Sequence, residues 1–153
     1  NFVALTQLRP YMPKEIMAVQ WIAEGCNVFN AFVPFYANIT KTPEYIANTT
    51  AEVTTENFYW ANRLIGTLAD AHFQTTAIFI ERYQNQVHSK GHALLSKFDK
   101  QFMTEKPNQV QHFLEGCNEE MAKMAKEETQ KTLSSVLYTA SNGMKNSFAR
   151  SDA

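Results

Sequence analysis

The sequence predicts an α+β chain in which about three β-strands are followed by two or three long helices. Apolar residues repeat with a period of two in the first part of the chain and with a period of 3.6 from Thr55 onward. Only five Gly and five Pro occur in 153 residues, so regular elements should dominate. We therefore expect a single partial domain over residues 1–153, with strands in 1–36, a loop in 37–54 and helices in 55–153.

Three strands are predicted over residues 2–9, 17–24 and 28–36, and Gly25-Cys26-Asn27 is predicted to be a short hairpin-type connection. The first two strands carry apolar residues on both faces, which is typical of strands that are covered on both sides. Three such strands cannot form a stable sheet with two covered faces by themselves. They need further strands or a second layer to cover those faces. The pattern indicates part of a larger fold.

A short helix over residues 44–48 is an option within the loop, and long helices follow it. Pro107 suits the first turn of the last helix, which could extend over about 35 residues, or about 50 Å. The predicted apolar stripes begin with Phe58, Ala61, Ile65 and Leu68, continue with Ile80, Val87, Gly91, Leu94, Phe98 and Phe102, and end with Val110, Phe113, Cys117, Met121, Met124, Leu133, Val136 and Ala140.

Composition excludes several classes of protein. A hydrophobic share of 44% and an aromatic share of 12% exclude a disordered chain. The net charge of −1 lacks the basic excess of a nucleic-acid-binding domain, so we expect no nucleic acid partner. No apolar stretch approaches the ~20 residues that a membrane helix needs, so we expect no membrane span. The location stays open, and we favour the cytoplasm over secretion.

His88 and His92 lie four residues apart on a predicted helix, a spacing that can chelate zinc or copper. The Glu of the metalloprotease pattern does not stand between them, and no third ligand is evident nearby. We therefore interpret them as polar side chains beside an apolar stripe, and expect neither a metal nor a cofactor. His72 and His112 are isolated and receive no role.

Other candidates for chemistry are few. A catalytic thiol needs a lowered pKa and a base, and neither Cys26 nor Cys117 has such a context, so we interpret both as structural. Arg9 ends the first strand, where a guanidinium can bind a carboxylate or stabilise a thiolate, although a structural ion pair is the commoner role. Trp21 and Tyr36 could line a pocket but are more often aromatics of the core or its rim.

Several short segments, in this order and spacing, resemble the dipeptidase A family, which comprises N-terminal-nucleophile cysteine peptidases of lactic acid bacteria and their relatives. The specific segments are Leu8-Arg9-Pro10, Pro13-Lys14-Glu15-Ile16, Val19-Gln20-Trp21 and Val33-Pro34-Phe35-Tyr36. Weaker ones are Phe58-Tyr59-Trp60-Ala61 and the tail Met144-Lys145-Asn146-Ser147-Phe148. The resemblance covers essentially the whole chain, but only the C-terminal portion of the family's protein.

The resemblance implies a four-layer αββα fold and a cysteine that becomes the first residue after processing. Its own α-amino group would act as the general base, and neighbouring donors would hold the oxyanion. Asn1 has no nucleophilic side chain, so we expect the cysteine to lie upstream and this chain alone to leave dipeptides, the implied substrates, intact. Related amidases place an arginine near the catalytic thiol, which implies a supporting catalytic role for Arg9.

The alternative is a non-enzymatic helical interaction module with a small β cap, which would bind a partner along its Met- and Phe-rich helices. Such a module would melt cooperatively as a monomer. Part of an enzyme would instead expose apolar sheet faces and form homo-oligomers that cover them.

Overall fold

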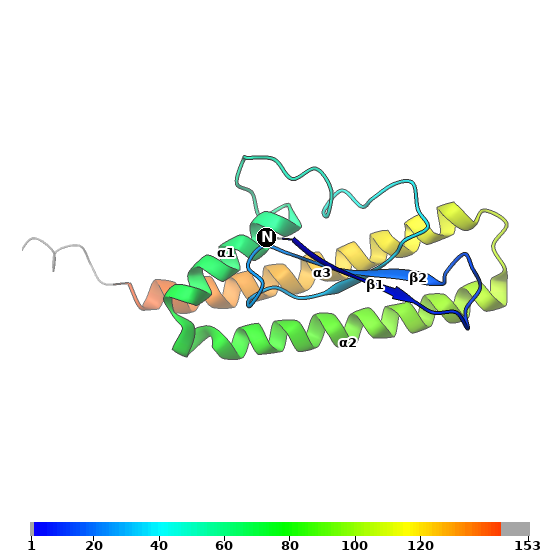
Figure 1. Cartoon of the computed structure of the whole chain (residues 1–153). Coiled ribbons are helices and arrows are strands. Elements are labelled where there is room, and N and C mark those ends of the chain that lie inside the picture. Colours follow the sequence, from blue (N-terminus) through cyan, green and yellow to red (C-terminus); the bar gives the residue numbers. More distant parts are fainter. Residues whose placement is uncertain (1, 145–153) are drawn as a thin grey trace, which may run out of the picture.

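Three antiparallel strands followed by three helices make up the chain in this computed structural model, which describes residues 2–144 (Figure 1). The strands are β1 (Phe2–Leu8), β2 (Ala18–Glu24) and β3 (Val33–Tyr36). The helices are α1 (Phe58–Ala71), α2 (Phe73–Glu105) and α3 (Val110–Asn142). The predicted α+β class is confirmed. The rest of the predicted helical region, with most of the tail segment 144–148, lies outside the described residues.

The sheet has the order β1-β2-β3, with Leu5 opposite Trp21 and Trp21 opposite Pro34. β1 is exposed along nearly its whole length, and Phe2, Leu5 and Leu8 are each about 60% exposed. The cover that the apolar residues of this strand predict is not formed within the described residues, because the helices pack on β2 and β3 and none of them packs on β1.

The third strand is shorter than predicted, since residues 28–32 belong to the connection after β2 and not to β3. Gly25 adopts a φ of 88°, which favours glycine, and the chain then folds into a turn. The backbone N–H groups of Phe29 and Asn30 both donate to the carbonyl of Cys26, at 2.9 and 3.0 Å. These bonds turn the backbone away from extended pairing, so the connection is longer than the predicted hairpin.

The helical region differs from the prediction in two places. No helix forms over 44–48, where the N–H groups of Ile46 and Ala47 close a single turn on the carbonyl of Pro43. Pro107 precedes the last helix instead of lying in its first turn. Lys106 ends α2 in a left-handed conformation with φ 46°, and four residues separate Glu105 from Val110. The predicted length of about 35 residues is confirmed, since α3 has 33.

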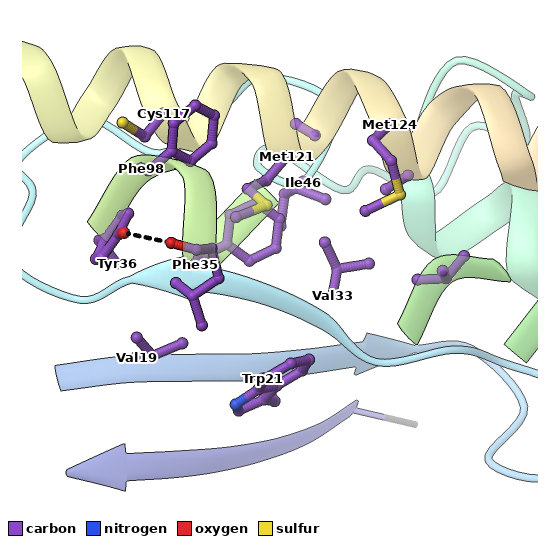
Figure 2. Close-up of a cluster of buried hydrophobic side chains, with 14 of the residues drawn as sticks. Val19, Trp21, Val33, Phe35, Tyr36, Ile46, Phe98, Cys117, Met121 and Met124 are labelled. Atoms are coloured by element: carbon purple, nitrogen blue, oxygen red, sulfur yellow. Dashed lines mark hydrogen bonds between the residues drawn. The ribbon is translucent and has the colours of Figure 1, made fainter. Parts of the chain in front are cut away.

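The core lies where α2 and α3, which run side by side, pack on β2 and β3 (Figure 1). Met121 and Met124 project from α3 toward the sheet, where Val33 and Phe35 lie (Figure 2). Because these methionines are buried with Phe98, the stripes that the interaction-module alternative needs as a binding surface form the interior instead. No helix among the described residues has the length and hydropathy to cross a membrane.

The outer edge of β3 is closed by a single side chain of α3. The backbone N–H of Tyr36 donates to Oδ1 of Asn118 at 2.9 Å, and Nδ2 of Asn118 donates to the carbonyl of Tyr36 at 3.0 Å. Asn118 is fully buried. Its amide thus takes the place of a neighbouring strand, which leaves β1 as the open edge of the described sheet.

Candidate functional site

Arg9, the residue predicted from the sequence, lies just after β1 and binds Asp99 of α2 through two hydrogen bonds. They run from Nη1 to Oδ2 (2.5 Å) and from Nη2 to Oδ1 (3.0 Å). Nη2 also donates to the carbonyl of Ile16, and the hydroxyl of Tyr36 donates to Oδ1 of Asp99 at 2.9 Å. Arg9 is only 5% exposed and Asp99 16%. The cluster ties the end of β1 and the end of β3 to α2.

The charges in this cluster keep Arg9 and Tyr36 protonated. Burial alone would lower the pKa of Arg9, but the hydrogen bond and the charge of Asp99 outweigh it and raise that pKa. Burial, followed by the charge of Asp99, raises the pKa of the Tyr36 hydroxyl well above its ordinary value. Neither group changes its proton near neutral pH. One buried donor of the cluster, Nε of Arg9, has no hydrogen-bond partner among the described atoms.

A second constellation surrounds Trp21, which we expected to be an aromatic of the core or its rim, with a pocket as the less common alternative. A cavity of about 340 Å³ is lined by Leu5, Gln7, Trp21, Phe32, His88 and His92. The indole Nε1 of Trp21 donates to Oε1 of Gln7 at 3.0 Å, which fixes the ring across the two strands. Trp21 thus serves both as a core residue and as a wall of this cavity.

His88 and His92 converge in that cavity, with 3.1 Å between their Nε2 atoms. Sequence spacing placed them on one face of the helix but did not show that Trp21 packs against both rings, at centroid distances of 5.8 and 4.7 Å. No cluster of three or more His, Cys, Asp or Glu side chains that could hold a metal ion exists within residues 2–144.

Both cysteines pack against neighbouring elements within the described residues. Cys117 is buried, and burial raises the pKa of its thiol to about 12, which disfavours the thiolate. Cys26 is half-buried, and Gly66 of α1 approaches it so closely that an added Cβ would stand 2.6 Å from its Sγ. Both cysteines therefore serve packing, as the sequence predicted.

Sequence reasoning missed Glu24, a buried carboxylate at the end of β2. Its Oε2 and the hydroxyl of Tyr45 are both buried without a hydrogen-bond partner in the described part of the chain. Burial raises the pKa of Glu24 to about 7. The available signal was a charged residue ending an otherwise uncharged strand, AVQWIAE, next to a glycine turn.

This α+β arrangement is consistent with the C-terminal part of an N-terminal-nucleophile hydrolase. Residues 1–86 match the profile of peptidase family C69. The chain belongs to this family, which confirms the resemblance seen in the sequence.

Proteins that carry a dipeptidase name are similar to nearly the whole chain. The "Dipeptidase" of Bifidobacterium longum is 38% identical over 98% of this chain and 35% of its own length. The "Probable dipeptidase A" of Streptococcus pyogenes is 40% identical over 97% of this chain and 31% of its own length. The "Dipeptidase A" of Lactobacillus helveticus is 30% identical over 77% of this chain and 25% of its own length. The chain thus spans about a third of the length of the curated relatives it matches.

Proposed function

We propose that this chain is the C-terminal part of a cysteine dipeptidase whose nucleophile lies outside residues 1–153. The observation that carries the proposal is the match of 97–98% of the chain to relatives named dipeptidase. The geometry supports it, since Cys117 is buried and burial raises the pKa of its thiol to about 12, which disfavours the thiolate that a nucleophile needs. The long uncovered strand β1 also suits a chain that packs against further structure.

The test compares hydrolysis of an unblocked dipeptide by the isolated chain and by a longer protein that contains it. We expect turnover only by the longer protein, with inhibition by a thiol reagent. Cys26→Ser and Cys117→Ser in the longer protein should remain active, because neither thiol is the nucleophile. Turnover by the isolated chain that either serine variant abolishes would overturn the proposal.

We further propose that Arg9 supports the reaction as a positioning residue. Its bonds to Asp99 and Ile16 hold the connection between β1 and β2 in one place, and lysine could satisfy at most part of this bidentate pattern. Arg9→Lys in the active protein should lower kcat by more than it changes KM, while circular dichroism still shows a folded protein. Arg82→Lys, at an exposed arginine of α2, is the control. Unchanged kinetics for Arg9→Lys would end this proposal.

A further inference from the structure

The imidazoles of His88 and His92 face each other from successive turns of α2, and their arrangement is unusual for a simple hydrogen bond. The two Nε2 atoms are 3.1 Å apart, the ring centroids 4.5 Å, and the ring planes are nearly perpendicular at 88°. Two rings whose nitrogens point straight at each other across 3.1 Å would hold their centroids about 5.4 Å apart. The rings are therefore tilted away from the line that joins their nitrogens.

The same distances match two imidazoles that share one metal ion. With a metal–nitrogen distance of about 2.0 Å and a right angle at the ion, the nitrogens would be about 2.8 Å apart and the centroids about 4.5 Å. A tetrahedral ion would place the nitrogens about 3.3 Å apart. The observed 3.1 Å lies between these values, so little movement of His88 and His92 is needed to bind an ion.

The sheet holds the pair in this arrangement. Trp21 packs against both imidazoles, and its own ring is fixed by the hydrogen bond to Gln7 on the neighbouring strand. Ligands that are held by a packed neighbour lose less side-chain entropy when they bind an ion. The cavity beside the pair, about 340 Å³, leaves room for the water molecules that would complete the coordination shell.

The charges around the pair do not oppose a cation. The other residues that line the cavity are Leu5, Gln7, Trp21 and Phe32, none of which is charged. The helix positions three and four residues away along α2 are also uncharged, namely Gln84, Asn85, Ser89, Gly91, Leu95 and Ser96. Lys90 lies between the two histidines, and its charge is paired with Glu128 of α3 at 2.7 Å. Burial, followed by the charge of His88, lowers the pKa of His92.

From this geometry we propose that His88 and His92 form a two-histidine chelating site for one divalent transition-metal ion of the copper, nickel and zinc series. Imidazole nitrogen suits these ions, and copper(II) should bind most tightly. The ion takes the place of the proton that the two Nε2 atoms share. That proton leaves for solvent, and the ring that carried it takes up a proton at Nδ1, so the pair stays neutral. The site is independent of the proposed peptidase activity.

Trp21 provides a direct readout, because a copper(II) ion on the pair would lie close enough to quench its fluorescence. Trp60→Phe leaves Trp21 as the one tryptophan of the chain. Titration of this variant with copper(II) chloride at pH 7.5 should quench the emission with one equivalent, and EDTA should restore it. His88→Ala or His92→Ala in the same background should raise the midpoint at least about tenfold. His112→Ala, at an exposed and isolated histidine, should leave it unchanged.

Two further measurements separate the site from nonspecific quenching. Electron paramagnetic resonance of the copper(II) complex should show coupling to two nitrogens, and to fewer in either His variant. Nickel(II) chloride should raise the thermal midpoint of the parent protein but not that of the His88→Ala and His92→Ala variants. Alanine suits both positions because both are exposed. Quenching at the same midpoint in His88→Ala or His92→Ala, or an equal loss in His112→Ala, would overturn the proposal.

Discussion

At the residue scale, Glu24 combines burial with the lack of a partner for one carboxylate oxygen. Burial disfavours the charged form, so the folded protein holds the proton to about pH 7, while the unfolded chain releases it near the ordinary pKa of 4.5. The folded state binds more protons between these values, so its stability falls as the pH rises from about 4.5 to 7.

Glu24→Gln should remove this dependence, because glutamine has no proton to release. Relative to the parent protein, the variant should gain up to about 3 kcal/mol in unfolding free energy between pH 4.5 and pH 8. Urea denaturation at the two pH values measures this change. Glu81→Gln, at an exposed glutamate of α2, should show no such gain, and an equal gain in both variants would contradict the assignment to Glu24.

The sequence identified candidate residues but not their tertiary partners. Arg9 stands out at a strand end before a proline, but its partner Asp99 is 90 residues away, and no local pattern joins the two. Likewise, spacing along the helix pairs His88 with His92, whereas the contact with Trp21 depends on how α2 crosses the sheet. Local chemistry thus marks candidate residues, and tertiary packing decides which of them meet.

At the scale of elements, two helical glycines differ in what surrounds them. Gly91 lets α2 approach β3, since an added Cβ would stand 2.8 Å from Cδ of Pro34. Gly116 of α3 has open space at the same position, with nothing within 4 Å. The close approach at Gly91 explains why glycine is used inside a helix, where alanine is otherwise favoured.

Alanine at these two positions should therefore have opposite effects. Gly116→Ala should raise the unfolding free energy by about 1 kcal/mol through helix propensity alone. Gly91→Ala should lower it by about 1–2 kcal/mol, because overpacking against Pro34 exceeds the same propensity gain. Chemical denaturation of both variants gives the comparison. Stabilisation in both would show that α2 and β3 can separate at no cost.

The helices were more predictable than the strands because their apolar stripes repeat over many turns. The length of α3 and about half of the buried residues of α2 and α3 follow from period alone. The segment 28–32 is as apolar as a strand but does not form one, because the chain turns after Gly25 and the N–H groups of Phe29 and Asn30 donate to the carbonyl of Cys26. The exposure of β1 could not be read from its apolar residues, since composition does not say whether a cover lies within the same chain.

At the scale of the whole molecule, β1 should make the isolated chain associate. Its seven residues, FVALTQL, contain no charge and no proline, so none of the usual devices protects this open edge. Sedimentation should show species larger than the monomer, with a fraction that grows with concentration. Replacing Leu5 and Leu8 together by Lys should shift the distribution to monomer.

The matched control is Leu137→Lys on α3, which changes an exposed leucine away from the sheet and should leave association unchanged. A parent chain that stays monomeric at all concentrations would contradict the prediction. It would also weaken the view that β1 packs against further structure, and so bear on the proposed function as well.

The hydrogen bonds between Asn118 and Tyr36 can form only after α3 has been synthesised, well after β3. The two residues are 82 positions apart, which corresponds to about 4–16 seconds of synthesis at about 5–20 residues per second. Throughout that interval the outer edge of β3 stays unpaired, because the amide that closes it has not yet been made. At this edge, the ribosome-bound chain is thus more exposed to mispairing than the finished one.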